Sequence, residues 1–252
     1  MSTAIDPRQY RPPAGLLRER VILITGAGAG IGRAAATSCA AHGATVILCG
    51  RTLAKLEQTY DAITAAGGPQ PAIAPLCLET AGESDYRELG ARTLAEFGRL
   101  DGLLHNAGIL GERTSIANYS AASWQRVLQV NLTAEFLLTK ALLPALRQSP
   151  SAAILFTSSG VGRRGRAFWG AYAVSKFGVE GLSQVLAAEL EQTSRIRVNC
   201  INPGATRTAM RAAAYPAEDP LTLKTPAELM PAYLYLLGPD SAGVTGQSFD
   251  AQ

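Results

Sequence analysis

Residues that bind metals or form disulfides are scarce in this sequence. Its 252 residues include four cysteines and two histidines. The cysteines stand singly inside apolar segments, with no CxxC spacing and no histidine-rich tract, so the sequence predicts neither a metal site nor a disulfide framework. We expect buried thiols in a protein of a reducing compartment. The cysteines are Cys39, Cys49, Cys77 and Cys200.

The sequence also lacks a large excess of positive or negative charge, and it lacks long apolar runs. Charged residues make up 17% and hydrophobic residues 47%, with a net charge of +3. This balance is typical of a globular protein and does not indicate a nucleic-acid binder. No stretch approaches the ~18 uninterrupted apolar residues of a membrane span, and the opening MSTAIDPRQYRPPAG lacks the apolar run of a signal peptide. We expect a cytoplasmic protein with no nucleic-acid or membrane partner.

Short apolar runs alternate with longer amphipathic segments along the chain. The amphipathic segments, such as GRAAATSCAAH and SDYRELGARTLAEFG, have a helical pattern. This alternation predicts an α/β fold, a single-domain Rossmann fold with a doubly wound parallel sheet of about seven strands and helices on both faces. The apolar runs are residues 21–25, 44–49, 72–78, 101–105, 152–157, 196–201 and, weakly, 247–250.

Two segments lie outside this alternation. The proline-rich opening predicts an extended N-terminal arm over residues 1–16, followed by one Rossmann-type domain over 17–252. Residues 204–225, GATRTAMRAAAYPAEDPLTLKT, form the least regular segment, and it is too long for an ordinary connection between a helix and a strand. Loops of this kind are often lids or binding loops, so we expect a substrate loop here.

A glycine-rich turn follows the first apolar run directly. The segment TGAGAGIG, Thr25 to Gly32, opens the first strand-to-helix unit. Glycines let the backbone turn tightly and approach a pyrophosphate, whose charge the helix N-terminus stabilises. Alone, such a segment could be a plain tight turn, but its place in an alternating chain favours dinucleotide binding.

The end of the second apolar run indicates which dinucleotide binds. A protein that prefers NAD carries an acid there, about 20 residues beyond the glycine turn, to bind the free ribose hydroxyl. This sequence has Gly50 and then Arg51, and a guanidinium group binds a 2′-phosphate. We therefore predict NADP(H), with NAD(H) less favoured. The alternative is a solvated arginine at a strand end, because no second basic residue occurs in the glycine turn, where Ala29 precedes Gly30.

Tyr172 and Lys176 lie four positions apart in the segment GAYAVSKFG, residues 170–178. On an α-helix these positions share a face, so the ammonium of Lys176 can lie near the phenol of Tyr172. A nearby cation stabilises phenolate and would make Tyr172 a usable proton donor or acceptor near neutral pH. The same spacing also occurs on ordinary helices, so the rest of the chain has to decide.

Several motifs occur in order along the chain, and together they resemble the short-chain dehydrogenase/reductase family. The resemblance extends from about Val21 to Gly246, and the family's serine, thirteen residues before its tyrosine, falls on Ser159 because 172 minus 13 is 159. Within the family, VGRRGRAFWGAY and the ending TGQSFDAQ are similar to the YciK-type bacterial oxidoreductases. The motifs are TGAGAGIG, HNAG (105–108), Asn131 in VNL, Ser159, YAVSK (172–176) and NPGATRT (202–208).

The resemblance implies a catalytic set of four residues. Tyr172 would protonate a carbonyl oxygen as hydride arrives, and would act as the base in the reverse direction. Lys176 would assist Tyr172 and hydrogen-bond the nicotinamide ribose, Ser159 would hold the substrate oxygen, and Asn131 would hold a water that connects Lys176 to solvent. Alternatives remain open: Ser159 or its neighbour Ser158 could simply cap a strand end, although the spacing favours Ser159, and Asn131 could stabilise a helix kink.

The resemblance also implies an activity and a cofactor site. The activity would be an NADP(H)-dependent carbonyl reductase or alcohol dehydrogenase for a small carbonyl or hydroxyl substrate. The alternative is a non-catalytic dinucleotide-binding sensor or scaffold, which needs no proton donor. The implied cofactor residues are Thr25, Gly26, Gly28, Gly30, Ile31, Gly32, Arg51, Asn106, Ala107, Gly108, Tyr172, Lys176, Pro203, Gly204, Thr206 and Thr208.

The sequence departs from the family pattern at three places. Cys77 stands where many members have an acid that receives the adenine amino group, with Glu79 two residues on. His105 replaces the first asparagine of the usual NNAG, and we interpret it as structural. The chain closes on Asp250, Ala251 and Gln252 without the family's frequent glycine pair. Which of Cys77 and Glu79, if either, binds adenine stays open.

Two further features concern the substrate and the assembly. Arg163, Arg164 and Arg166 lie between the candidate serine and tyrosine, where they could bind an anionic substrate group or form a solvated loop or an interface. The resemblance implies a homodimer or homotetramer joined through the helix of Trp124 and the helix of Tyr172.

Overall fold

The computed structural model describes residues 5–252, and its centre is one parallel sheet. Seven strands lie in the order β3-β2-β1-β4-β5-β6-β7, and every neighbouring pair is parallel. The predicted single-domain Rossmann fold is thereby confirmed. The strands are β1 (Val21–Thr25), β2 (Thr45–Gly50), β3 (Ala72–Pro75), β4 (Gly102–His105), β5 (Ala153–Thr157), β6 (Arg197–Asn202) and β7 (Ser248–Asp250).

All seven strands fall within or beside the predicted apolar runs. The largest difference is at the third run, where the strand ends at Pro75 and leaves 76–78 outside the sheet. Proline has no backbone N–H for the next ladder bond. Leu76 N still donates to Gly50 O over 3.0 Å, and the chain then turns along the edge of the site.

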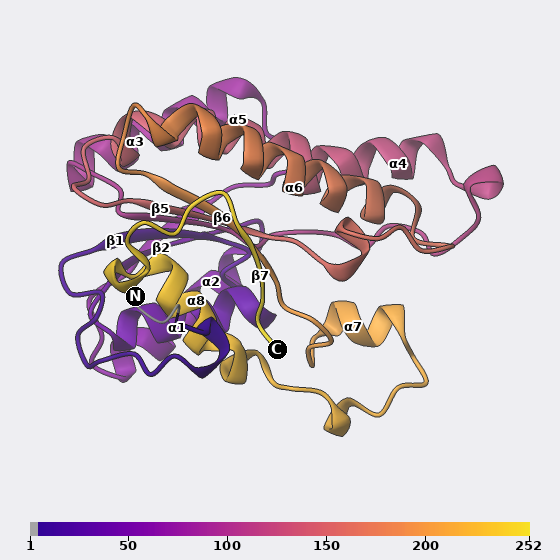
Figure 1. Cartoon of the computed structure of the whole chain (residues 1–252), viewed down its shortest axis with the longest axis horizontal. Coiled ribbons are helices and arrows are strands. Elements are labelled where there is room, and N and C mark those ends of the chain that lie inside the picture. The colour runs from indigo at the N-terminus through magenta and orange to yellow at the C-terminus, as the bar shows by residue number, and fades with distance from the viewer. Residues whose placement is uncertain (1–4) are drawn as a thin grey trace.

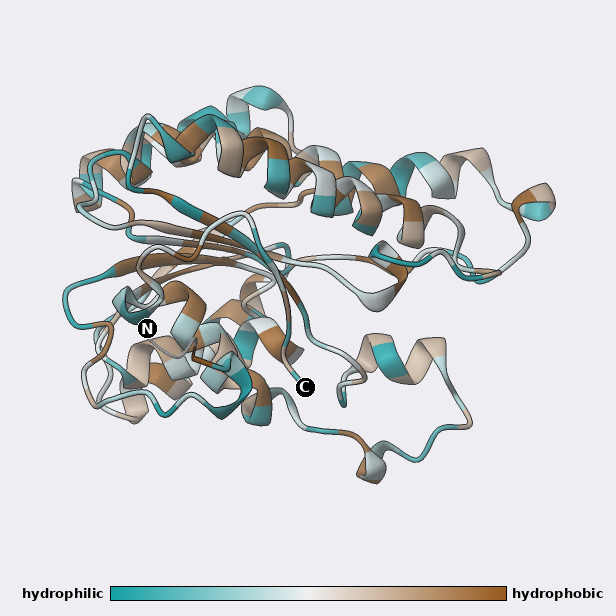
Figure 2. Ribbon diagram, viewed as in Figure 1, coloured by the Kyte–Doolittle hydropathy of each residue, from teal (hydrophilic) through white to brown (hydrophobic). Residues whose placement is uncertain are grey.

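Helices cover both faces of the sheet (Figure 1). One hydrophobic core lies between the sheet and α1, α2 and α8, and a second lies between the sheet and α3, α5 and α6. The hydropathy colouring shows the strands as mostly hydrophobic stretches between these two layers (Figure 2). The helices are α1 (Gly30–Ala41), α2 (Leu53–Ala65), α3 (Glu83–Phe97), α4 (Ala121–Leu128), α5 (Ala134–Leu146), α6 (Gly170–Glu191), α7 (Ala209–Ala214) and α8 (Met230–Leu237).

The long helical segment around Asn131 is interrupted by a π-helical turn, η3 (Gln129–Thr133), between α4 and α5. Asn131 lies inside this turn and is buried. Turns of this kind inside helices are frequent at functional sites. Short 3₁₀ helices complete the fold: η1 (Pro7–Gln9), η2 (Ile116–Asn118), η4 (Gly160–Gly162), η5 (Pro220–Thr222), η6 (Pro226–Leu229) and η7 (Pro239–Ser241).

The N-terminal arm is not extended throughout and packs on the domain. Residues 1–4 lie outside the described residues, and η1 follows shortly after them. The ring of Tyr10 lies 5.2 Å from that of Tyr235 on α8, and its hydroxyl donates to Asp240 over 2.7 Å. The arm therefore covers one side of α8. Across residues 5–252, none of the helices has both the length and the apolar character to cross a membrane.

The long loop over 204–225 has structure of its own. It contains α7 and η5, and a parallel bridge joins Thr206 to Lys224 near its two ends. Arg207 fastens the loop further, because its Nε donates to Pro220 O over 2.7 Å. The segment is thus a compact flap at the carboxyl side of the sheet, below and beside the C-terminus in Figure 1.

Candidate functional site

A cavity of about 430 Å³ opens at the carboxyl ends of the strands. This is the edge at which open parallel sheets bind their ligands. Of the predicted site residues, all but two line the cavity, and the two exceptions are Gly32 and Asn131. The predicted residues that line it are Thr25, Gly26, Gly28, Gly30, Ile31, Arg51, Asn106, Ala107, Gly108, Ser159, Tyr172, Lys176, Pro203, Gly204, Thr206 and Thr208.

The glycine turn forms one end of the cavity, and close contacts explain its composition. Gly26 and Gly30 have φ of 69° and 54°, a region that favours glycine. A Cβ on Gly32 would lie 2.2 Å from the carbonyl oxygen of Gly26, and one on Gly28 would lie 2.8 Å from Lys55 Cβ. Gly32 therefore acts beneath the turn, by letting α1 pack against it, rather than at the cavity wall.

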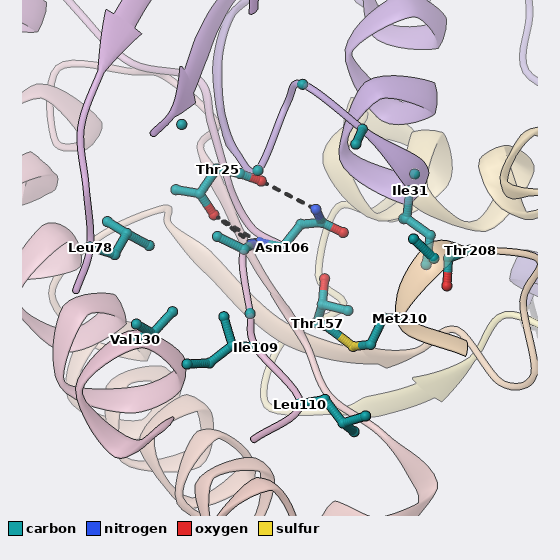
Figure 3. A pocket seen from close by; sticks show the side chains of 18 of the residues that line it. Thr25, Ile31, Leu78, Asn106, Ile109, Leu110, Val130, Thr157, Thr208 and Met210 are labelled. Carbon is teal, nitrogen blue, oxygen red and sulfur yellow. Dashed lines mark hydrogen bonds between the residues drawn. The ribbon is translucent and has the colours of Figure 1, made fainter. Parts of the chain in front are cut away.

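Thr25 joins the glycine turn to the segment after β4. Its hydroxyl accepts hydrogen bonds from the backbone N–H groups of Asn106, at 2.9 Å, and Ala107, at 3.0 Å. The Asn106 side chain in turn donates to Thr25 O over 3.2 Å, and Figure 3 shows both residues meeting at the cavity wall. These bonds hold β1 and β4 in fixed register where the cavity begins.

Two exposed cations lie at the glycine end of the cavity. Arg51 follows β2, and Lys55 lies in the first turn of α2 against Gly28. Neither forms an ion pair with any residue in 5–252, so both are available to an anion. The sequence pattern did not point to Lys55, because Lys55 lies outside the glycine turn; the available signal was its place in the first turn of α2, which begins two residues after Arg51.

The segment after β3 forms the neighbouring wall. Leu76, Cys77, Leu78 and Glu79 all line the cavity, and Figure 3 shows the Leu78 side chain on that wall. Glu79 is held by Arg126, whose Nε lies 3.0 Å from Glu79 Oε2. A hydrogen bond with Thr80 lowers the pKa of the Cys77 thiol. This wall therefore combines the apolar side chains of Leu76 and Leu78 with the Cys77 thiol and the paired carboxylate of Glu79.

Tyr172 and Lys176 lie together at the opposite end, on α6. Both are buried, at 9% and 3% exposure, yet both line the cavity. Lys176 Nζ donates to Thr157 O at the end of β5 over 2.7 Å, and it lies 3.8 Å from Glu135 Oε1. The sequence pointed to the Tyr172 and Lys176 pair but not to Glu135.

Asn131 holds the backbone beside this pair instead of facing the cavity. Its Oδ1 accepts from Ile109 N over 2.8 Å, and its Nδ2 donates to Ile109 O over 2.9 Å. Nδ2 also lies 3.1 Å from the hydroxyl of Ser175, the residue before Lys176. Asn131 therefore connects the π-helical turn to both the segment after β4 and to α6.

His105 is structural, as predicted from the sequence. It is 1% exposed, stacks on Phe156 at 4.7 Å between ring centroids, and its Nε2 lies 2.8 Å from the hydroxyl of Thr139. Burial, with a smaller contribution from Lys176, lowers the pKa of His105 to about 3. The imidazole is therefore neutral and adds no charge beside Lys176.

Ser158 and Ser159 both line the cavity after β5. Ser158 is 1% exposed, and its hydroxyl makes no hydrogen bond within residues 5–252. Ser159 is more accessible and begins η4, so it meets both the main cavity and a neighbouring one of about 670 Å³. Either hydroxyl can reach a ligand from this wall, and the spacing to Tyr172 favours Ser159.

The three arginines of the serine-to-tyrosine loop have different surroundings. Arg163 is held by Glu180 at 3.3 Å and by Asp250 at 2.9 Å, and it lines neither cavity. The interpretation of Arg163 as an anchor for a substrate anion is therefore disfavoured by its contacts. Arg164 and Arg166 line the neighbouring cavity, and Arg166 donates to the hydroxyl of Tyr215 over 2.9 Å.

An aromatic cluster and the flap helix α7 close the outer side. Trp169 lies 5.6 Å from Tyr172 and 6.0 Å from Tyr215 between ring centroids. Met210 on α7 packs on this cluster, and Figure 3 shows its side chain at the cavity. Thr208 caps α7 by accepting from Arg211 N over 3.1 Å. A substrate would meet apolar and aromatic surface here.

Comparison with known proteins defines the class of protein. The family model described as short chain dehydrogenase matches residues 20–219. The parallel sheet, the glycine turn and the Tyr172 and Lys176 pair all agree with that match. The chain belongs to the short-chain dehydrogenase family, a family of oxidoreductases.

Particular relatives cover nearly the whole chain. The uncharacterized oxidoreductase YciK of Escherichia coli K12 is 54% identical over 243 residues, which is 96% of each chain. A chain from Pseudomonas syringae, solved as a short-chain dehydrogenase, is 57% identical with a TM-score of 0.95, covering 97% of this chain and 99% of its own. A short-chain dehydrogenase from Escherichia coli CFT073, complexed with NADPH, is 54% identical with a TM-score of 0.93, covering 96% and 100%. The predicted YciK-type resemblance is thereby confirmed.

Proposed function

We propose that this protein is an NADP(H)-dependent oxidoreductase that interconverts a small carbonyl compound and its alcohol. The observation that carries the proposal is a single cavity with a glycine turn and two unpaired cations at one end and Tyr172 with Lys176 at the other. The relative complexed with NADPH supports the choice of cofactor. When bound, NADP(H) supplies or accepts the hydride.

The residues at the glycine end fit a 2′-phosphorylated dinucleotide. The backbone of Gly26 to Gly30 can approach a pyrophosphate because Gly26, Gly28 and Gly30 carry no side chain, and α1 begins there without a side-chain cap. Arg51 and Lys55 would hold the 2′-phosphate. Gly50 leaves no carboxylate to repel it. Asn106, Ala107 and Gly108 would line the adenosine side, and Pro203, Gly204, Thr206 and Thr208 the nicotinamide side.

At the other end, the chain's own residues would manage one proton. Tyr172 would donate its phenolic proton to the carbonyl oxygen during reduction and recover a proton from the alcohol during oxidation. Lys176 would stabilise the phenolate and hydrogen-bond the nicotinamide ribose. Ser159 would donate to the substrate oxygen. Asn131, whose side chain is bonded to Ile109 and Ser175, would connect Lys176 to solvent through a water.

The first experiment is a parallel titration of the purified protein with NADPH and NADH, followed by nicotinamide fluorescence. We expect NADPH to bind at least about 10-fold more tightly, since a charge-assisted hydrogen bond contributes about 1.5–3 kcal/mol. A panel of aromatic and alicyclic carbonyls, chosen because Trp169 and Met210 line the cavity, would then be screened with NADPH. Preference for NADH would overturn the cofactor assignment.

The alternative is a dinucleotide-binding sensor or scaffold without turnover. The presence of Tyr172 and Lys176 at the cavity argues against it, because a protein that only binds a dinucleotide needs no proton donor. Tight NADPH binding with no turnover on the panel, in either direction, would favour the sensor.

We also propose a homo-oligomer located in the cytoplasm. Phe136 on α5 and Val174, Phe177 and Val185 on α6 are exposed at 45–57%. Exposed apolar side chains on these helices favour packing between two copies. All four cysteines are free, as expected in a reducing compartment. Light scattering after size exclusion would show a dimer or tetramer, and a monomer at micromolar concentration would refute the oligomer.

A further inference from the structure

A buried acid lies behind Lys176 and has no part in the proposed chemistry. Glu135 is in the first turn of α5, shortly after Asn131, and it is 2% exposed. Its Oε1 lies 3.8 Å from Lys176 Nζ, and neither side chain is more than 4% exposed. Lys176 lines the cavity whereas Glu135 does not. Glu135 can therefore act on the cavity only through Lys176.

The carboxyl group of Glu135 has no other polar partner. Neither of its oxygens receives a hydrogen bond from any residue in the range 5–252. Burying an ionised acid without partners is costly, so such a group is paired or takes up a proton. Burial raises the pKa of Glu135 to about 8, and Lys176 opposes this rise. Both charge states of Glu135 are thus accessible near neutral pH.

The groups on the packed elements leave Lys176 as the charge that faces Glu135. His105 on β4 is neutral for the reason given above. Burial raises the pKa of Cys200 on β6 and of Tyr86 on α3 to about 12, so both are uncharged. Further along α6, Glu180 is paired with Arg163, and Tyr172 is the group whose proton is transferred.

We propose that Glu135 is a positioning residue that sets how much of the Lys176 charge acts on Tyr172. A protonated Glu135 leaves the ammonium unopposed and favours the phenolate of Tyr172. An ionised Glu135 neutralises the pair and disfavours that phenolate. The proton involved is released to solvent or taken from it, and no bond to substrate is made. This inference rests on the proposed function.

The kinetic test compares the wild type with Glu135→Gln in the oxidation direction, using NADP⁺ and an alcohol. Because oxidation of an alcohol needs a base, kcat/KM is expected to rise with pH in both proteins. In Glu135→Gln, whose side chain never ionises, we expect the rise at least about half a pH unit lower than in the wild type. Superimposable profiles, or an equal loss at every pH, would overturn the proposal.

A second measurement tests the coupling without turnover. Infrared difference spectroscopy between pH values follows the carboxylic acid band that Glu135→Gln removes. In Lys176→Met, with the neighbouring ammonium gone, we expect Glu135 to keep its proton to a pH about one unit higher or more. An unchanged midpoint would refute the pairing. If no alcohol or carbonyl is turned over, the proposed function fails, while this measurement still decides whether Glu135 and Lys176 are coupled.

Two further variants guard against a structural explanation. Glu83→Gln removes an exposed carboxylate on α3. This carboxylate lies 2.9 Å from Lys140, which is on α5 like Glu135, so the variant should keep the wild-type dependence of kcat/KM on pH. Glu135→Asp retains a titrating acid on a shorter side chain. If Glu135→Gln does not fold, Glu135→Asp serves as the test. Its carboxyl group lies farther from Lys176, so the pH at which kcat/KM rises should differ from that of the wild type. An unchanged pH for this rise would overturn the proposal.

Discussion

The two ends of the cavity hold their cations in opposite ways. Arg51 and Lys55 are exposed and unpaired within residues 5–252, whereas Lys176 is 3% exposed, bonded to Thr157 O and close to Glu135. An exposed cation costs little to maintain and can release its water to an incoming anion. A buried cation needs a hydrogen bond or a counter-charge. The exposed end thus suits recognition, and the buried end suits control of a proton.

The largest effect should come from the buried end, through Tyr172→Phe. Removal of the phenolic hydroxyl should lower kcat by about 10²–10⁴-fold, the range of general acid catalysis. Because the ring is kept, the loss of NADPH affinity should be much smaller than the loss of kcat. Steady-state kinetics and fluorescence titration check both. A variant with normal turnover would exclude Tyr172 as the proton donor. The buried end of the cavity could then no longer be assigned to control of a proton.

The exposed end depends on a rigid turn, which Gly32→Ala should disrupt. The new Cβ would lie 2.2 Å from a backbone oxygen that cannot move aside easily. We expect the free energy of unfolding to fall by about 3 kcal/mol, as in overpacked sites, together with loss of NADPH binding. Urea denaturation measures the first.

The matched control is Gly181→Ala, also within a helix. Its added Cβ meets nothing within 4 Å, so it should stabilise the protein by up to about 1 kcal/mol. Equal effects of the two variants would show that the turn tolerates a side chain.

Recognition by the exposed cations is tested with Arg51→Ala, Lys55→Ala and the double variant. Each single change should weaken NADPH binding by about 10-fold or more, while NADH binding stays nearly unchanged, because only NADPH carries the 2′-phosphate. Binding of both cofactors would be measured by calorimetry at fixed salt. An equal loss for NADH would assign these cations to the pyrophosphate instead.

The smallest effect is expected for Arg163→Ala. Arg163 holds Glu180 and Asp250, so its loss should lower the free energy of unfolding by about 1 kcal/mol. KM for anionic and for neutral carbonyls should be unchanged, since Arg163 does not reach the cavities. Arg164→Ala, which removes an arginine at the neighbouring cavity, is the matched control. A rise in KM for anionic substrates in Arg163→Ala alone would support the interpretation of Arg163 as an anchor for a substrate anion.

Local patterns predicted most of the fold and most of the cavity wall. Apolar runs located all seven strands within a few residues, and motif spacing brought the glycine turn, Asn106 and the Tyr172 pair to one cavity. The sequence offered a helix kink at Asn131 only as an alternative; the π-helical turn found there lies beside bonds from Asn131 to Ile109, 22 positions away, which local patterns do not show. Gly32 was placed at the cofactor, although it acts through packing beneath the turn.

By itself, the sequence determined the succession of strands and helices along the chain, the glycine turn and the spacing of Tyr172 and Lys176. These features follow from the periods of strands and helices and from residues that are close in the chain. Only the tertiary structure decided which charges meet. It brought Arg163 to Asp250 and Glu135 to Lys176. Such pairs join separate elements, and the energy of a charge depends on its burial and its neighbours in space rather than on its place in the chain.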